Sequence, residues 1–428
     1  MTYQETKSFL DSLNNLGSIP GLESIKELLL RLGNPQNRIK FIHISGTNGK
    51  GSVNAFISSI LKSAGYKTGR YISPAVLSPL EIIQLNNENI SEEEFSNIIS
   101  EVAYYCKEMT KDGLNHPTRF EIETAAAFLF FYRQKCDLAV IECGMGGLLD
   151  ATNVISTTIC SVITPISVDH TSFLGNTLYE ITHHKAGIIK PQIPVISGRQ
   201  TDTAANVISQ TALKNNSECI FIKNSINNIR FSENFITFDY ENFDNISISL
   251  MGIYQPDNAI TALECAVMLR KYGYAISDEN IYEGLRRATW FGRFSKLGTA
   301  PDFIVDGAHN PDGAKMLSKS LEIYYPNGGL TFIVGIFKDK DYGKILDCCI
   351  PFAKNVIVIE TPNNPRAMPA KILAEFIKKH YDVCVYTYEL IDEAVKCALE
   401  ITHKDSAVIA FGSLSHLEAV KRAYEVIL

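Results

Sequence analysis

A glycine-rich segment near the N-terminus contains the residue types needed to hold a phosphate. Glycines let backbone N–H groups turn toward phosphate oxygens, a following helix N-terminus adds partial positive charge, and a lysine reaches the terminal phosphates. A hydroxyl at the end of the segment suits a magnesium ion. Unlike the usual Walker sequence, Gly51 separates Lys50 from the hydroxyl of Ser52. The alternative is a turn without a ligand. The segment reads Ser45-Gly46-Thr47-Asn48-Gly49-Lys50-Gly51-Ser52.

Two more residues with chemically useful side chains follow apolar runs. Glu142 closes the run that begins at Leu138, and a carboxylate is costly to bury there without a partner. A metal ion, a cationic partner or a buried ion pair is therefore expected beside it. His309 lies between a predicted strand and a predicted helix, where an imidazole can face phosphates.

Strand-length apolar runs alternate with segments of helical period along almost the whole chain. This pattern predicts an α/β fold in which mainly parallel sheets are covered by helices. Ligands of open parallel sheets gather outside the carboxyl ends of the strands, so the chemistry is expected in the turns that follow them. Apolar residues recur at helical spacing directly after the glycine-rich loop, which predicts a helix there. The predicted strands are 41–44, 138–142, 159–164, 303–306, 332–335, 356–359 and 407–411.

The sequence also predicts a division into two domains. Gly, Pro and polar residues between Arg293 and Asp302 come just before a predicted strand, as expected of a domain boundary. We expect a larger domain over 1–296, which carries the phosphate loop, and a smaller one over 297–428. Between Asn215 and Asn245, apolar residues alternate with Asn and Ser, which predicts antiparallel hairpins attached to the first domain.

Composition and charge exclude several classes of protein. Of 428 residues, 46% are hydrophobic and 20% charged, as in a soluble globular enzyme and unlike a disordered, fibrous or disulfide-stapled chain. The net charge of −7 offers no basic excess for nucleic acid. No apolar run approaches the roughly 20 residues that span a bilayer, and the first residues lack a signal-peptide core. We therefore expect a cytoplasmic protein without nucleic-acid or membrane partners, whose ten scattered cysteines are reduced.

The form Gly-Thr-Asn-Gly-Lys-Gly-Ser resembles the phosphate loop of the Mur ligase superfamily. Within it, the chain is similar to the folylpolyglutamate synthase and dihydrofolate synthase branch. The order and spacing of the motifs together carry this resemblance, which extends from end to end. The motifs are Gly21-Leu22-Glu23, 31–36, 46–52, 71–74, 142–147, 149–153, 169–171, 174–175, 185–190, 255–259, 292–294, 306–311, 361–366 and Gly412-Ser413.

The resemblance implies an ATP- and Mg²⁺-dependent ligase. In that family a carboxylate is phosphorylated by ATP to an acyl phosphate, which the amino group of L-glutamate then attacks. The acceptor is a folate, dihydropteroate or both. The resemblance also implies a P-loop-containing Mur-ligase-type domain with a mainly parallel sheet, a smaller Rossmann-like α/β domain at the C-terminus that ligates glutamate, and a monomer. Cations and fixed dipoles suit this reaction because the γ-phosphate and the acceptor carboxylate repel each other.

The resemblance also assigns roles to individual residues. Ser52, Ser73, Glu142 and His170 are implied to coordinate Mg²⁺. Lys185 matches a position at which CO₂ carbamylates the lysine, giving a carboxylate-like group that helps hold a second metal ion. Lys50, His170 and Lys185 form the implied catalytic set. Structural alternatives remain open: a buried ion pair for Glu142, a cap or core residue for His170, a turn residue for Ser73 and a surface ion pair for Lys185.

Nucleotide and pterin positions follow from the same resemblance. Asn258, Arg293 and Asp306 match positions that bind ATP, and the paired donors of Arg293 suit the γ-phosphate. Arg293 as an interdomain ion pair and Asp306 as a helix cap are the alternatives. Domain closure over the site would keep water from the acyl phosphate. The pterin-site candidates are Gly21, Leu22, Glu23, Phe120 and Glu121, where Phe120 either stacks on a pterin ring or packs in the core.

Several positions depart from the family pattern. The expected His is Ala75, the expected Arg residues are Ile82 and Leu148, the expected Glu is His184, and a second expected His is Asp312. These changes leave two interpretations open. Either the loops have drifted in a folate enzyme, or a related ligase joins a different carboxylic acid and amino acid.

Two other classes compete with a ligase. A Rossmann oxidoreductase is suggested by the glycines at 144, 146 and 147, but the full G-x-G-x-x-G and a helix opening on it are missing. A noncatalytic nucleotide switch would keep Lys50 without needing Glu142, His170 and Lys185 together.

Overall fold

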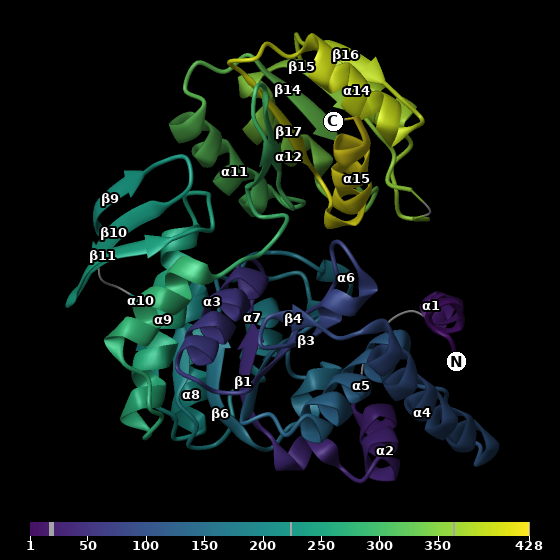
Figure 1. The fold of residues 1–428 in the computed structure, drawn as a ribbon, viewed down its shortest axis with the longest axis vertical. Helices are drawn as coiled ribbons and strands as arrows, with labels where there is room; N and C mark the ends of the chain where they lie inside the picture. The colour runs from purple at the N-terminus through teal and green to yellow at the C-terminus, as the bar shows by residue number, and fades with distance from the viewer. Residues whose placement is uncertain (17–20, 223–224, 363, 428) are drawn as a thin grey trace. The chain divides into compact units, whose positions relative to one another are not determined.

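The computed structural model describes residues 1–16, 21–222, 225–362 and 364–427. The chain forms two compact units (Figure 1), each built from several stretches of sequence. The first unit comprises Met1–Ala75, Pro79–Ser249 and Pro256–Thr289, and the second comprises Val76–Ser78, Leu250–Gln255 and Trp290–Leu428. The domain bounds expected from the sequence, 1–296 and 297–428, stay a prediction.

The large sheet of the first unit is mainly parallel. Its central strands run β2-β5-β1-β6, and each is parallel to its neighbours in this group. Buried apolar residues lie on both faces of β5, β1 and β6, as is typical of parallel sheets covered by helices, whereas β2 carries the buried Arg70. In sheet order the described strands are β4 (Glu88–Asn89), β3 (Ile83–Leu85), β2 (Thr68–Tyr71), β5 (Leu138–Glu142), β1 (Lys40–Ser45), β6 (Thr158–Ile163), β7 (Val195–Ser197) and β8 (Cys219–Phe221).

Helices cover both faces of this sheet. On one face, Phe41 and Tyr71 from the strands form a core with Phe128 and Phe131 of α5. The opposite face is covered by α3, which begins at Lys50 within the phosphate loop and packs against α10. The helices of this unit are α1 (Tyr3–Ser12), α2 (Glu23–Arg31), α3 (Lys50–Ser63), α4 (Glu92–Lys111), α5 (Arg119–Arg133), α6 (Thr171–Leu174), α7 (Leu178–Ala186), α8 (Asp202–Lys214), α9 (Gln255–Lys271) and α10 (Asp278–Arg287).

A small antiparallel sheet is attached to the first unit. It consists of β9 (Asn227–Phe231), β10 (Ile236–Tyr240) and β11 (Phe243–Ile248). The predicted hairpins are thus found, although they extend beyond Asn245. The early part of the predicted hairpin segment differs, because β8 joins the large sheet in parallel with β7. Positions 223 and 224 of the hairpin segment and position 363 of the 361–366 motif lie outside the described residues.

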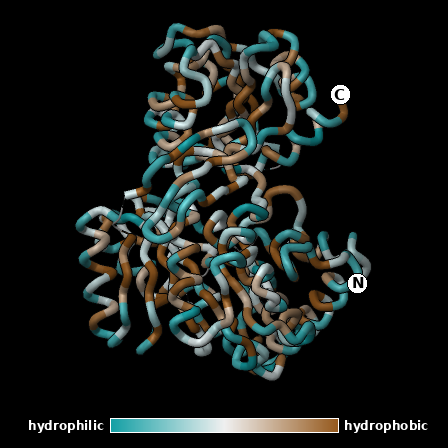
Figure 2. The backbone as a smooth tube through the Cα atoms, turned by 60° about the vertical axis from the view of Figure 1, so that its left-hand side comes forward, coloured by the Kyte–Doolittle hydropathy of each residue, from teal (hydrophilic) through white to brown (hydrophobic). Residues whose placement is uncertain are grey.

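The second unit is also an α/β layer structure. Its strands are parallel except for the antiparallel edge strand β12. Figure 2 shows hydrophobic stretches running through the interior of each unit and hydrophilic stretches near the outside. The described strands, in sheet order, are β12 (Ser295–Gly298), β13 (Asp302–Val305), β17 (Ala407–Phe411), β14 (Leu330–Val334), β15 (Ala353–Val358) and β16 (Cys384–Thr387), and the helices are α11 (Pro311–Tyr324), α12 (Tyr342–Cys349), α13 (Ala370–His380), α14 (Ile391–Ile401) and α15 (Leu417–Ile427).

The predicted α/β class, with parallel-rich sheets in two units, is confirmed. Strands β5 and β17 begin and end at the predicted residues, and the other predicted strands are found with ends displaced by one to three residues. The helix predicted after the phosphate loop is α3.

A substitution at Gly284 tests the close packing of α10 on α3. A Cβ atom at Gly284 would lie 2.4 Å from the Cα and 2.6 Å from the N of Ile60, which are backbone atoms that cannot move without shifting a helix. Gly284→Ala should therefore lower the stability by about 1–3 kcal/mol, the usual cost of overpacking.

The control is Gly343→Ala in α12, where the nearest atom to a new Cβ is 3.8 Å away. There the better helix propensity of alanine should leave stability unchanged or slightly higher. Urea unfolding followed by circular dichroism measures both variants, and equal midpoints for the two would contradict the packing argument.

Candidate active site

The order of the central strands gathers the predicted site residues of the first unit at one edge. Because β2, β5, β1 and β6 are parallel neighbours, their carboxyl ends lie side by side. Ser73 follows β2, Glu142 ends β5, the phosphate loop follows β1, and His170 follows β6. Residues far apart in sequence are therefore brought to the same edge by strand topology.

The phosphate loop is held in place by backbone and side-chain hydrogen bonds. The N–H groups of Thr47 and Asn48 donate to the carbonyl of Pro165, at 3.0 and 3.3 Å, and so anchor the loop to the segment after β6. Gly49 precedes α3 with φ of 92°, a backbone conformation that favours glycine. A Cβ there would lie 2.5 Å from Oδ1 of Asn258. The predicted nucleotide residue Asn258, in α9, thus contacts this loop.

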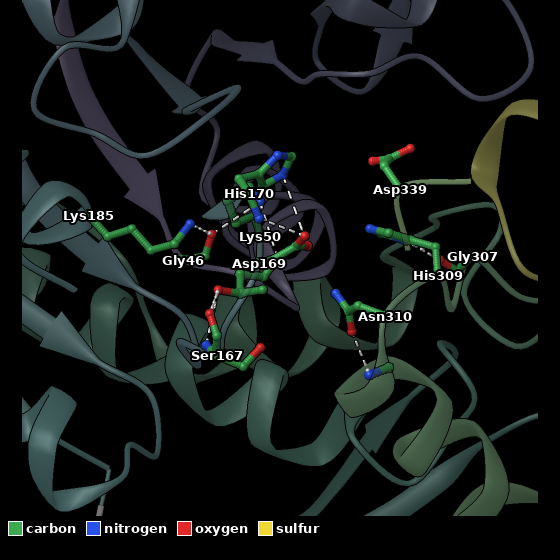
Figure 3. A network of polar contacts seen from close by, with 12 residues as sticks. Gly46, Lys50, Ser167, Asp169, His170, Lys185, Gly307, His309, Asn310 and Asp339 are labelled. Atoms are coloured by element: carbon green, nitrogen blue, oxygen red, sulfur yellow. Dashed lines mark hydrogen bonds and ion pairs between the residues drawn. The ribbon is translucent and has the colours of Figure 1, made fainter. Parts of the chain in front are cut away.

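Two lysine side chains converge on the same loop carbonyl. Nζ of Lys50 donates to the carbonyls of Gly46 and Thr47, both at 3.3 Å, and Nζ of Lys185 donates to that of Gly46 at 2.7 Å (Figure 3). Lys185 lies in the last turn of α7 and is 2% exposed. Burial, and then the nearby Lys50 ammonium, lower the pKa of Lys185 to about 7. A substantial fraction of this amine is therefore neutral at neutral pH.

The implied metal ligands are oxygen donors and one imidazole. Ser52 in α3 and Glu142 at the end of β5 are 1% and 5% exposed, Ser73 is half-buried, and the side chain of His170 is 40% exposed. The backbone N–H of His170 donates to Oδ1 of Asp169 at 2.8 Å. Among the described residues, no group of three or more His, Cys, Asp and Glu side chains forms a ready-made metal cluster.

This donor set fits a nucleotide-bound Mg²⁺ better than an ion enclosed by protein. Mg²⁺ prefers oxygen ligands and usually takes one or two carboxylates, several waters and substrate phosphates. A buried carboxylate and a buried hydroxyl beside a phosphate loop supply the protein share of such a shell. The second ion implied by the resemblance needs a further anionic ligand, which unmodified Lys185 does not provide.

Asp150 belongs to the 149–153 motif, and the resemblance gives it no role at the site. Its carboxylate is buried and accepts hydrogen bonds from the N–H groups of Met145 (2.8 Å) and Thr152 (3.0 Å) and from the Thr152 hydroxyl (2.6 Å). Burial raises its pKa, while these hydrogen bonds lower it. Asp150 thereby fixes the loop that directly follows Glu142. In a sequence, an aspartate within a glycine-rich loop indicates a residue that stabilises the loop, because its carboxylate can accept hydrogen bonds from nearby backbone N–H groups.

The pterin-site candidates divide into two kinds. Phe120 is half-buried beside the loop after β5: a Cβ at Gly144 would lie 2.7 Å from its ring, and its ring centroid is 6.2 Å from that of Tyr71. Glu121 is buried and accepts from the N–H and hydroxyl of Thr118, both at 2.8 Å, as part of the α5 capping box. This geometry favours a structural role for Glu121.

The N-terminal pterin-site candidates belong to the start of α2. Oε2 of Glu23 accepts from the N–H of Leu22 at 3.0 Å, and Gly21 and Leu22 are both half-buried. The described contacts do not include one that joins this segment to the phosphate loop.

The remaining nucleotide candidates belong to the second unit. Asp306 is buried, and its carboxylate accepts from the hydroxyl of Tyr254 and the N–H groups of Phe294 and Ala308, each at 2.8 Å. Burial raises the pKa of Asp306, and the Arg293 guanidinium opposes this rise. These bonds give Asp306 a structural role in holding the chain around Arg293. Nδ1 of His309 donates to the carbonyl of Gly307 at 2.7 Å.

The departures from the family pattern lie in different environments. Ile82 is buried in the core beneath α5, and Ala75 packs against the same core. Leu148 is 37% exposed, and its N–H donates to the carbonyl of His184 at 2.7 Å. Asp312 is exposed in the first turn of α11. Two expected arginines are thus replaced by apolar residues, one in the core at Ile82 and one on a surface loop at Leu148.

Comparison with known proteins identifies the family. The Mur ligase middle domain matches residues 44–266, and the Mur ligase glutamate ligase domain matches residues 292–414. The chain is 32% identical to the dihydrofolate synthase/folylpolyglutamate synthase of Bacillus subtilis, over 98% of each chain. The chain belongs to the folylpolyglutamate synthase/dihydrofolate synthase family.

Solved structures of members of this family have the same fold. A Mycobacterium tuberculosis folylpolyglutamate synthase complexed with ADP matches with a TM-score of 0.90 and 28% identity, covering 99% of this chain and 98% of that one. Escherichia coli FolC in complex with DHPP and ADP matches with a TM-score of 0.85 and 27% identity, over 99% and 97%. Family membership excludes the Rossmann oxidoreductase. Within the described ranges, no helix has the length and apolar character to cross a bilayer.

The contact between the phosphate loop and Asn258 generates a testable prediction. Gly49→Ala should weaken binding of a non-hydrolysable ATP analogue at least tenfold, because the methyl group would overlap Asn258 and alanine disfavours a φ of 92°. Isothermal titration calorimetry measures the affinity.

Gly65→Ala is the matched control. Gly65 has a φ of 85° but no atom within 4 Å of a new Cβ, so it incurs the same backbone strain without a contact. Its affinity for the nucleotide should equal that of the unmodified protein. Equal affinities for all three proteins would show that the loop does not hold the nucleotide.

Proposed function

We propose that this protein is an ATP- and Mg²⁺-dependent ligase that joins L-glutamate to a folate, to dihydropteroate, or to both. The observation that carries the proposal is the convergence of Lys50 and Lys185 on the Gly46 carbonyl, at the sheet edge where Glu142 ends β5. This edge combines cations for phosphate groups with a buried carboxylate for a metal ion. The Bacillus subtilis relative, named for both activities, supports the same acceptors.

The reaction begins with transfer of the γ-phosphoryl group to the acceptor carboxylate. An oxygen of the carboxylate forms a bond to phosphorus while the bond to the β-phosphate oxygen breaks, giving an acyl phosphate and ADP. Lys50 and the N-terminus of α3 hold the phosphates and offset the repulsion between the two anions. The glutamate amino group then attacks the acyl carbon, phosphate leaves, and the amine loses a proton.

The metal ion is assigned to the phosphate side of the site. Ser52, Ser73, Glu142 and His170 would hold Mg²⁺ with the nucleotide. When bound, Mg²⁺ neutralises phosphate charge and orients the reacting oxygens. Burial of Ser52 and Glu142 fixes these two donors before the nucleotide arrives. The proposed nucleotide contacts are Asn258, Arg293, Asp306 and His309. The residues proposed to line the pterin site are Gly21, Leu22, Glu23, Phe120 and Glu121.

Lys185 is proposed to carry a carbamate in the active enzyme. The lysine first loses the proton of its ammonium form. The neutral amine then attacks the carbon of CO₂, an N–C bond forms while a C=O π bond opens to give a carboxylate oxygen, and the nitrogen loses a second proton, which leaves an anionic carbamate. Lys185 suits this step because it is 2% exposed and lies beside the Lys50 ammonium, so burial and repulsion both favour loss of its positive charge. The resulting carbamate would be the anionic ligand that the second metal ion requires.

A different acid and amine remain the second candidate. This chain has Ile82 and Leu148 in place of two expected arginines, and Ala75 and Asp312 in place of two expected histidines, so these positions lack side chains whose chemistry suits a carboxylate. The nucleotide and metal residues are unaffected by these changes, so both candidates share the first half of the reaction. We also propose a monomer, on the basis of the resemblance, and a cytoplasmic protein, on the basis of the sequence composition.

An activity measurement separates the two candidates. Phosphate release with ATP, Mg²⁺ and glutamate should be stimulated by dihydropteroate, by tetrahydrofolate or by both, and mass spectrometry should detect the glutamylated product. Lys50→Ala should abolish turnover with an unchanged circular dichroism spectrum, because it removes the phosphate cation. ATP binding with no response to either acceptor would refute the folate assignment.

The state of Lys185 is tested without an activity assay. With ¹³C-labelled bicarbonate, NMR should show a carbamate carbon that is lost in Lys185→Arg, whose guanidinium does not react with CO₂. Lys190→Arg is the control, since Lys190 contacts the carbonyl of Asn153 rather than the phosphate loop. A signal that persists in Lys185→Arg would assign the carbamate elsewhere.

A further inference from the structure

Arg70 is an arginine inside the large sheet. It belongs to β2 and is 3% exposed. Its Nε donates to Oδ1 of Asn54 at 3.1 Å, one terminal nitrogen donates to Oε1 of Gln84 at 3.1 Å, and the other donates to the carbonyl of Gly51 at 3.4 Å. Two of these partners belong to the first turns of α3. The guanidinium therefore joins strand β2 to the start of the phosphate-binding helix.

Strand register places Arg70 on the same face of the sheet as Glu142. Arg70 pairs with Val140 in the parallel β2–β5 ladder. Residues two apart on a strand point to the same face, so the side chain of Glu142 lies on the face of Val140 and Arg70. The contacts of Arg70 with Asn54 and Gly51 show that α3 covers this face.

A second buried carboxylate, that of Glu81, shares this environment. Glu81 is 9% exposed, and its carbonyl accepts from Gln84, the strand partner of Arg70. Burial lowers the pKa of Arg70 to about 10, while Glu142 and Glu81 act in the opposite direction. Arg70 is therefore charged at neutral pH. A buried cation and two buried carboxylates compensate one another here, as buried charges require.

We propose that Arg70 is the resident counter-charge of the metal site: its guanidinium balances Glu142 and Glu81 before Mg²⁺ enters and holds the start of α3 in position. Arg70 is thus a positioning residue, since it acts through Glu142 and α3 and touches no reacting atom. The inference rests on the proposed metal role of Glu142.

The test is Mg²⁺ binding by the nucleotide-free protein, followed as the rise in melting temperature with MgCl₂ at constant ionic strength. Arg70→Met removes a cation that opposes the metal ion, so the Mg²⁺ affinity should increase about three- to tenfold, as expected for one charge near the site. Glu81→Gln leaves the charge of Arg70 in excess and should weaken Mg²⁺ binding by a similar factor. Arg70→Lys keeps the charge and should remain within about twofold of the unmodified protein.

Arg133→Met is the matched control, because Arg133 is an exposed arginine that pairs with Glu101 on the surface. Its Mg²⁺ affinity should not change. The proposal is supported if Arg70→Met raises the Mg²⁺ affinity and Glu81→Gln lowers it. It is overturned if the affinity does not change or if both variants change it in the same direction. If Arg70→Met does not fold, Glu81→Gln alone decides: weaker binding supports the proposal, and unchanged or tighter binding overturns it.

Enzyme kinetics provide the second readout. Because Arg70 holds α3, Arg70→Met should lower kcat at saturating Mg²⁺ at least tenfold, and Arg70→Lys should recover part of it. An unchanged kcat in Arg70→Met would overturn the positioning role. If the unmodified protein glutamylates no pterin, the proposed function fails, while the Mg²⁺ affinities still decide the role of Arg70.

Discussion

Charge compensation at the carboxyl edge of the large sheet is the constraint on which the rest of the site depends. Lys185 and Glu142 are both almost fully buried there, and Lys50 shares a carbonyl acceptor with Lys185. Buried charges are tolerated when partners, hydrogen bonds or a lost proton compensate them. This edge therefore combines lysine side chains suited to phosphate groups with a buried carboxylate suited to the proposed metal ion.

The scaffold makes this arrangement possible because it orders strands differently in space and in sequence. β5 lies between β1 and β2, although α3 connects β1 to β2 directly along the chain. Glu142 is thereby inserted between the phosphate loop and Ser73. Asp150 then stiffens the loop beyond Glu142 through backbone hydrogen bonds. Side chains that are held rigidly in this way need to move little when charge develops during phosphoryl transfer.

The sequence alone predicts local features well where a single physical signal dominates. The phosphate loop, strand β5 and helix α3 follow from glycine chemistry and hydrophobic period. The pairing register of strands that lie far apart in the chain cannot be read from one sequence. Only the structure therefore shows that Arg70 and Glu142 lie on the same face of the sheet. The helix-capping hydrogen bonds of Glu121 are likewise visible only in the structure, whereas its place in the pterin site stays a prediction from the resemblance. The family resemblance supplied roles that spacing does not.

The second unit takes part of its core from distant stretches of the chain. Val76 packs with Phe303 and Leu417, and Met251 packs against the neighbouring core cluster. During synthesis, Val76 leaves the ribosome long before either of its partners. The first unit has all of its sequence once Thr289 has emerged, whereas the second stays incomplete until α15 is made. The segment Val76–Ser78 therefore reaches its final neighbours in the second unit only at the end of synthesis.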